Sequence, residues 1–247
     1  MRPVTEPLLG RMILVRVRGR SDKEHAICWS GSMGIRILLL LIALSPAGWG
    51  QRYFATVVGG IATLEADAAT RVDSTNAASL YKPENGAALN VAVGVHLNDW
   101  FSVQANYIWN QNDLTITEIV DSVHLQQDRH SSEHAVIADL LLYFRSRRSR
   151  IRPYLSAGTG FVRMFSTADG PVQGTLTPVP LQVDATELPL RVAVGADLLF
   201  GGGWGFRYSF SETISRNPFS AALNPPGARR LANFQNLFGV VKYFGSR

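Results

Sequence analysis

The densest group of reactive side chains in the sequence is the segment His130-Ser131-Ser132-Glu133-His134. A serine, a histidine and a carboxylate are the three groups that nucleophilic acyl transfer requires. This makes His130, Ser132 and Glu133 the candidate catalytic residues. His-x-Ser is a very common pattern, however, and the segment also has the composition of a polar loop that enters a strand. We therefore expect a non-enzymatic chain and keep hydrolysis as the alternative.

Three histidines, at positions 124, 130 and 134, could offer imidazole ligands to a metal ion. Their spacing matches no metal-binding motif, and we expect neither a metal site nor a cofactor. The single cysteine, Cys28, precedes the patterned part of the chain, so no disulfide framework or cysteine zinc site is possible after Gln51. Gly201–Gly203 lacks the Lys-Ser/Thr pair of a phosphate loop and is interpreted as a tight turn.

Five arginines crowd one short segment of the chain: Arg145, Arg147, Arg148, Arg150 and Arg152. They could bind the anionic head groups of lipids at the inner leaflet. The alternative, which we favour at this level, is a solvated turn whose charges prevent the neighbouring strands from extending.

Charge is distributed unevenly along the sequence. The first 50 residues contain 7 of the 24 Lys+Arg and 3 of the 19 Asp+Glu, so the rest of the chain is nearly neutral. A nucleic-acid partner would require a basic stripe on the folded part, and the charge balance gives no support for one.

Residues 33–50 have the three-part layout of a secretory signal peptide. Arg36 precedes the apolar run Ile37–Leu44, and small residues with Pro46 follow. The run is well short of the ~20 residues that a membrane-spanning helix needs. We expect translation to begin at Met33, which leaves residues 1–32 as an unstructured extension and residues 51–247 as the mature domain. The alternative is a start at Met1 with a long basic segment before the apolar run.

The elements that must position these side chains are strands. In Phe101–Asn110, apolar and polar residues alternate with a period of two, as strands do. Eight segments have this character: Tyr53–Leu64, Leu89–Leu97, Phe101–Asn110, Val136–Phe144, Tyr154–Phe165, Leu190–Leu198, Trp204–Ser211 and Ala232–Phe244.

The connections between these segments alternate in length. Short ones cover residues 98–100, 145–153 and 200–203, and long ones cover 65–85, 111–132, 166–186 and 212–231. Short turns at one end and long loops at the other are the pattern of a transmembrane barrel. The predicted fold class is therefore all-β, an eight-stranded antiparallel up-and-down transmembrane β-barrel in the outer membrane of a Gram-negative bacterium.

Alternation alone leaves open which face points inward, because a soluble lipocalin-like barrel has its apolar face inside. The polar face here is rich in Ser, Gln, Asn and Gly with few charges, which favours an interior over a surface in bulk water. Six polar residues are then expected inside the barrel: Gln104, Asn106, Asp139, Arg191, Asp197 and Arg207. Because unpaired buried charges are costly, we expect ion pairs that fill the lumen, with a gated polar conduit as the alternative.

Aromatic residues gather near the ends of the predicted strands, as in the girdles at the two membrane interfaces. The candidates are Trp100, Tyr107, Trp109, Tyr143, Trp204 and Phe244. Lys242 has the same parity as Phe244, so it must either face the wrong way or extend to the rim.

From Gln51 onward the chain resembles the OmpA/OmpX-like eight-stranded outer-membrane barrels. The resemblance is carried by the signal peptide, the alternating segments, Arg152–Phe161 (RPYLSAGTGF) and Leu237–Phe244 (LFGVVKYF). It departs from the family pattern in that Gly245, Ser246 and Arg247 follow the terminal aromatic residue.

The resemblance implies a structural or envelope-integrity role, or adhesion and recognition by the long loops. The implied partners are the lipid bilayer, lipopolysaccharide, the barrel-assembly machinery and an unknown extracellular ligand. The placement of His130 and Ser132 also resembles the lipid A deacylase barrels, whose His-x-Ser pair works at the outer leaflet. A lipid A-modifying hydrolase and a narrow pore therefore remain as alternatives.

Overall fold

The computed structural model describes residues 53–66, 71–72, 77–121, 123–174, 179–223 and 226–245. The predicted unstructured N-terminal segment (residues 1–32) and the predicted signal peptide (residues 33–50) lie outside the described residues. Among the described residues, no helix is long and apolar enough to cross a membrane.

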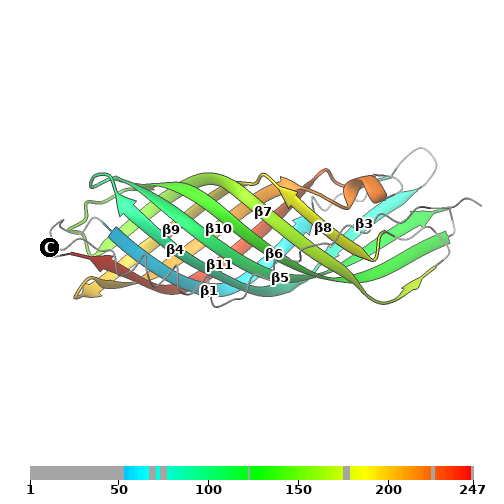
Figure 1. Ribbon diagram of the computed structural model, residues 1–247, viewed down its shortest axis with the longest axis horizontal. Helices are drawn as coiled ribbons and strands as arrows, with labels where there is room; N and C mark the ends of the chain where they lie inside the picture. Colours follow the sequence, from blue (N-terminus) through cyan, green and yellow to red (C-terminus); the bar gives the residue numbers. More distant parts are fainter. Residues whose placement is uncertain are drawn as a thin grey trace, which may run out of the picture. The chain divides into compact units, whose positions relative to one another are not determined.

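Eight antiparallel strands form a closed ring (Figure 1). In their order around the ring they are β1 (Tyr53–Ala66), β4 (Asn85–His96), β5 (Phe101–Val120), β6 (Val123–Tyr143), β7 (Ile151–Gln173), β9 (Leu190–Gly201), β10 (Trp204–Arg216) and β11 (Arg230–Phe244). The first and last strands close the ring through a continuous ladder from Tyr53↔Phe244 to Ala66↔Leu231. Six of the eight predicted segments lie within these strands, and the other two end one residue beyond them, at Leu97 and Phe144, so the predicted barrel is confirmed.

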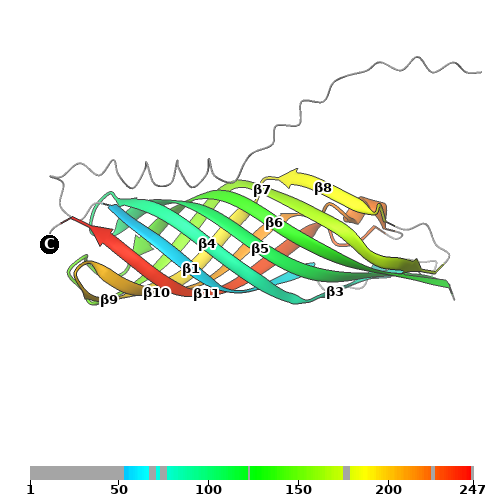
Figure 2. The same ribbon diagram turned by 60° about the horizontal axis from the view of Figure 1, so that its bottom comes forward.

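The register fixes the geometry of the barrel. Cross-strand partners followed from Tyr53 around the ring lead back to β1 at Thr63, ten residues beyond the start, so the shear number is 10. Eight strands with this stagger tilt by about 40° from the barrel axis. The inclination is visible in Figure 2, where β1, β4 and β5 run diagonally across the wall.

Three shorter strands extend the wall beyond the ring at its long-loop end. β3 (Ala78–Pro83) pairs with β5 above the end of β4, and β8 (Gln182–Glu187) pairs with β7 above the end of β9. β2 (Arg71–Val72) pairs with β3, and the 3-10 turn η1 (Ser220–Ala222) lies in the β10–β11 connection. We name the described residues within 71–83, 111–132, 163–187 and 214–231 the extension.

The prediction of a long loop at residues 111–132 was wrong, because most of that segment is a two-stranded ribbon. β5 and β6 pair without interruption from Phe101↔Leu142 to Val120↔Val123. In Figure 1 this ribbon extends beyond most strands of the ring, together with β7, which pairs with β6 as far as Gln126↔Gln173. Residues 166–173 and 182–186, also predicted as loop, belong to β7 and β8.

The face that carries the apolar residues changes along these strands. In the ring, outward positions of β5 are apolar, as at Val103 and Tyr107, while inward Gln104 and Asn106 are polar. In the extension the phase is inverted. Leu114 and Ile116 of β5 point inward and are buried, next to outward Thr115 and Thr117. The inversion places apolar residues against lipid in one half and inside a water-surrounded sheet in the other.

Candidate functional site

The interior of the ring is built around a buried ion pair. Arg207 of β10 donates from Nε to Asp197 Oδ1 at 2.6 Å and from Nη2 to Asp197 Oδ2 at 2.7 Å. The two residues are direct partners on neighbouring strands, so their side chains leave the sheet side by side. Arg207 Nη1 also donates to Gln104 Oε1 at 2.8 Å, which joins the pair to the opposite wall. Bidentate geometry with further hydrogen bonds is what makes burial of two charges tolerable.

A second ion pair continues this network towards the long-loop end. Arg191 donates from Nη1 to Asp139 Oδ2, which also accepts a hydrogen bond from Asn106 Nδ2 at 3.1 Å. Asn106 Oδ1 in turn accepts from Gln104 Nε2 at 2.6 Å and from Asn90 Nδ2 at 3.2 Å. The structure thus places all six residues predicted for the interior inside the barrel, in one connected network.

The assignment of Tyr143 to an aromatic girdle was wrong, because this side chain lies inside the barrel and is only 1% exposed. Its hydroxyl accepts from Arg207 Nη2 at 3.0 Å and donates to Asp197 Oδ2 at 3.3 Å. The parity of β6 already carried this signal, because Tyr143 alternates with lipid-facing Leu142 and Phe144 and shares the face of Asp139.

Arg152 is an interior residue that sequence reasoning placed in the solvated turn. Its guanidinium stacks 3.8 Å from the Tyr143 ring centroid and donates to the Tyr243 hydroxyl at 3.2 Å. An apolar and aromatic layer surrounds it at the short-turn end: Phe54, Leu141, Tyr143, Tyr154, Leu199, Val241 and Tyr243. Arg152 lies two residues before Tyr154 and so shares its inward face of the strand, which indicates an interior position. The four neighbouring arginines led to its prediction as part of the turn instead.

Glu133 is also an interior residue, which separates it from the predicted catalytic group. Its Oε2 accepts from Asn233 Nδ2 at 2.6 Å and from Asn110 Nδ2 at 3.4 Å, on the inner side of β6. Gln235 extends this cluster, because its Nε2 donates to Asn110 Oδ1 at 3.1 Å and its Oε1 accepts from the Ser211 hydroxyl at 3.1 Å. Because His130 and Ser132 face outward, Glu133 cannot orient either of them.

The lumen is filled by these side chains. Between the two ion pairs, next to Asn90, Gln104 and Arg191, the remaining cavity has a volume of about 10 Å³. A cavity of that size holds about one water molecule. At the long-loop end a buried apolar cluster covers the interior: Leu64, Leu114, Ile116, Met164, Val179, Phe219, Leu223 and Leu231. Side chains of the described residues therefore occupy the interior at both levels.

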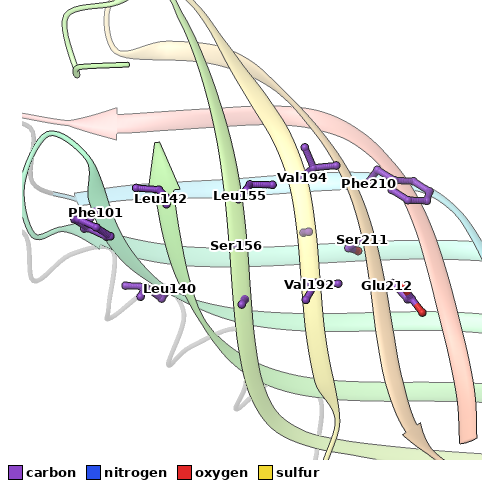
Figure 3. A pocket seen from close by; sticks show the side chains of 12 residues that line it. Phe101, Leu140, Leu142, Leu155, Ser156, Val192, Val194, Phe210, Ser211 and Glu212 are labelled. Atoms are coloured by element: carbon purple, nitrogen blue, oxygen red, sulfur yellow. The ribbon is translucent and has the colours of Figure 1, made fainter. Parts of the chain in front are cut away.

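The outer wall of the ring is apolar, which resolves the choice between the two faces. Figure 3 shows Leu142, Leu155, Val194 and Phe210 in one row, and Leu140, Val192 and Glu212 in the next. The shallow groove between the rows, of about 630 Å³, has Ser156 and Ser211 at its floor. An almost wholly apolar wall of this kind suits hydrocarbon chains and would be costly to expose to water.

The remaining girdle candidates lie near the two edges of the apolar wall. Trp100, Tyr107 and Trp204 are 49%, 45% and 46% exposed, and Trp109 and Phe244 are half-buried. Lys242 extends to the rim, where its Nζ donates to the Gly202 carbonyl at 2.7 Å and lies 4.7 Å from the Trp204 ring centroid. Lys242 therefore lies on the outer face of β11, as Phe244 does, while its ammonium group stays out of the apolar wall.

The histidines of the predicted catalytic segment lie on the outer face, just above the apolar wall. His130 Nδ1 is 2.5 Å from Asp113 Oδ1 of β5, and its Nε2 is 3.1 Å from Gln111 Nε2. Ser132 is the next outward residue of β6. The carboxylate that orients the histidine is therefore Asp113, which the sequence did not single out. An amide occupies the histidine nitrogen that would have to accept the serine proton.

The three histidines considered as metal ligands do not come together. They lie on one strand, six and four residues apart, and at ~3.3 Å per residue this separates them by well over 10 Å. His134 instead pairs through Nδ1 with the Tyr107 hydroxyl at 2.8 Å. No group of acidic, histidine or cysteine side chains among the described residues could hold a metal ion.

Two arginine–aspartate pairs of the described residues lie on the surface outside the apolar wall, one at each end. In the extension, Arg163 donates to both carboxylate oxygens of Asp184, at 3.0 and 2.8 Å. At the short-turn end, Arg147 Nε donates to Asp99 Oδ1 at 2.7 Å. In each case the hydrogen bond from the guanidinium lowers the pKa of the carboxyl group below its ordinary value.

Comparison with known proteins agrees with this geometry. Residues 36–229 match the model of the outer membrane protein beta-barrel domain family. No curated protein matches the chain.

Solved structures that the chain resembles include OprG from Pseudomonas aeruginosa (14% identity, TM-score 0.48, covering 81% of this chain and 99% of that one). Another is neisserial surface protein A (12% identity, TM-score 0.45, covering 78% and 97%). A third is Ail of Yersinia pestis in complex with the heparin analogue sucrose octasulfate (11% identity, TM-score 0.41, covering 78% and 99%). The family match together with the closed, apolar-walled ring shows that this chain belongs to the outer-membrane β-barrel domain family and is located in the outer membrane.

Proposed function

We propose that this protein is a non-enzymatic, non-conducting barrel that acts through its extension, which recognises or adheres to a ligand outside the cell. In outer-membrane barrels the short turns face the periplasm and the long connections face outward, so the extension is extracellular. The observation that carries the proposal is the contrast between the two halves. The cavity between the two interior ion pairs has a volume of only about 10 Å³, whereas the described residues of the extension form a sheet with its own apolar core.

The arrangement suits recognition because an ordered surface loses little conformational freedom on binding. The β5–β6 ribbon is paired as far as Val120↔Val123, and β3 and β7 support it on its two sides. Its outward residues include the polar side chains of Asp113, Thr115 and Thr117, with Ile119 as an exposed apolar residue at its tip. A role in envelope integrity would instead depend on the ring, which is why the two roles can be separated experimentally.

The test replaces residues 115–128 by an Asn-Gly turn, which favours a two-residue hairpin. Cells that carry the shortened protein, the wild type or no protein are compared for adhesion to extracellular matrix and for sensitivity to detergent. We expect the shortened protein to insert, to keep its mobility shift between boiled and unboiled samples, and to lose adhesion while detergent resistance stays normal. Normal adhesion, with detergent sensitivity only in cells that lack the protein, would instead assign it to envelope integrity.

One observation favours a second candidate, a hydrolase that acts on lipid esters of the outer leaflet. Asp113, His130 and Ser132 share the outer face above the apolar wall, and the Asp113–His130 distance is 2.5 Å. For catalysis, Gln111 would have to release His130 Nε2 to Ser132. Mass spectra of lipid A from cells with the wild type, with S132A and without the protein decide this. If lipid A loses an acyl chain in cells with the wild type, but not in cells with S132A or without the protein, the protein is the hydrolase.

A narrow pore is the third candidate, and the packed interior argues against it. Single-channel recordings in planar bilayers should show no steps for the wild type. Regular conductance steps would contradict a filled lumen.

A further inference from the structure

The turn between β6 and β7 is the most strongly basic surface at the periplasmic end. It runs from Phe144 to Ile151, two lipid-facing residues that are 53% and 48% exposed. Arg145 and Arg150 therefore stand immediately beyond the edge of the apolar wall. That edge is where the phosphates of a leaflet lie, and a long arginine side chain readily reaches them.

The five arginines of this segment have three different roles. Arg152 is buried in the lumen, and Arg147 is bound to Asp99 of the neighbouring β4–β5 turn. Arg145, Arg148 and Arg150 are exposed, and no side-chain partner of theirs is found among the described residues. In the three turns of this end, Asp99 is the single acidic side chain, and Arg147 already occupies it.

The turn is held in place on both sides. On one side, Arg147 binds Asp99 of the β4–β5 turn. On the other side, the Leu199 amide of strand β9 donates to the Arg150 carbonyl at 2.8 Å. Within the turn, the Ser149 amide donates to the Ser146 carbonyl at 3.0 Å. The three exposed guanidinium groups thus project from a fixed backbone. Preorganisation of this kind reduces the cost of binding.

We propose that Arg145, Arg148 and Arg150 bind the phosphate head groups of anionic phospholipids in the periplasmic leaflet. A guanidinium group presents paired N–H donors that match phosphate oxygens in a bidentate way. Three such groups beside a single acid, Asp99, which Arg147 already binds, favour a head group with net negative charge over a zwitterionic one. The proposal is independent of the ligand of the extension, because it concerns the opposite end of the barrel.

The test uses the full chain expressed in a Gram-negative host and purified in a nonionic detergent. Native mass spectrometry counts bound dioleoyl phosphatidylglycerol and dioleoyl phosphatidylcholine on the wild type and on R145Q/R148Q/R150Q. The matched control is R216Q/R229Q/R230Q, which removes the same charge from exposed arginines of the extracellular end. Unboiled samples of each variant on denaturing gels verify that the barrel is closed.

An arginine near an anionic surface contributes a factor of about five in affinity, so the periplasmic variant should bind phosphatidylglycerol on the order of a hundredfold more weakly. The single substitution R148Q should give about a fivefold loss, and the control should stay within a factor of two of the wild type. Binding of phosphatidylcholine should be weak throughout, and 10-fold excess inorganic phosphate should leave phosphatidylglycerol bound.

Three outcomes would overturn the proposal. Undiminished phosphatidylglycerol binding by R145Q/R148Q/R150Q would exclude the turn as the site. An equal loss in the extracellular control would reduce the effect to net charge. Displacement of the lipid by inorganic phosphate would make free phosphate, and not a membrane lipid, the ligand of this turn.

Discussion

At the scale of single residues, the interior shows how charges are accommodated in a lumen without bulk water. Each buried acid of the central network has both a guanidinium partner and amide or hydroxyl donors. The polar parity of the predicted strands was sufficient to place Asp139, Arg191, Asp197 and Arg207 inside. It could not identify which acid pairs with which arginine, because pairing depends on the register between strands.

Removal of one member of a buried pair should be far more harmful than removal of both. We expect Asp197→Leu to lower the free energy of unfolding by about 3–5 kcal/mol, because Arg207 then remains buried without its counter-ion. Asp197→Leu combined with Arg207→Met should cost less than the single change. Urea unfolding in lipid vesicles, followed by tryptophan fluorescence, measures both. A single variant less harmful than the double would contradict the pairing.

Gly195 gives a prediction about packing. A methyl group there would come within 2.4 Å of the Tyr154 ring and of the Tyr208 carbonyl oxygen, so the neighbours would have to move. We expect Gly195→Ala to cost about 1–3 kcal/mol in the same unfolding assay. The matched control is Gly59→Ala, where the nearest atom is the Ala88 carbonyl oxygen at 3.5 Å. Equal stability of the two variants would contradict the packing.

The Asp99–Arg147 pair predicts a pH dependence at the periplasmic end. Its hydrogen bond lowers the pKa of Asp99 below 3.8. The pair therefore stabilises the protein at pH values above the ordinary carboxyl pKa, and this stabilisation is lost as the pH falls through the lowered pKa. Carbon NMR of the Asp99 carboxyl group should therefore show a midpoint below 3.8, and Arg147→Gln should move the midpoint upward. An unchanged midpoint in that variant would contradict the assigned cause.

At the scale of elements, the sequence predicts the parts of strands that contact lipid and misses the parts above them. Lipid forces outward residues to be apolar, so Phe101–Asn110 alternates clearly. Above the membrane, β5 exposes Asp113 and Thr115 but buries Leu114 and Ile116, so the phase of the pattern is reversed. A period-two pattern that changes phase within one strand looks like the end of that strand. This is why 111–132 was predicted as a loop.

The inversion of the apolar face can be tested with two neighbouring substitutions. Ile116→Asp places a charge in the buried core of the extension, where Ile116 is 0% exposed. We expect it to unfold the ribbon and to make intact cells sensitive to proteinase K within residues 111–132, while the ring keeps its mobility shift. Thr117→Asp, on the outer face, should leave the ribbon protected. Cleavage in both variants would mean that the two faces are not distinguished.

At the scale of the whole molecule, the ring depends on the contact between the two ends of the domain. β11 closes the sheet by pairing with β1 over its whole length and with β10 on its other side. We therefore expect a protein that lacks residues 230–247 to show no mobility shift and to be degraded in the cell, since β1 and β10 would both become open edges. A shifted band from that truncated protein would contradict closure through β11.

The β1–β11 ladder also has a consequence for the rate of folding. Tyr53 and Phe244 are partners across almost the entire domain, so the loop-closure entropy of the last contact must be supplied before that contact contributes any stability. A sheet in which this ladder has not yet formed has two open edges with unpaired backbone groups. The chain is therefore most exposed to mispairing with other chains in the interval before its final strand is in place.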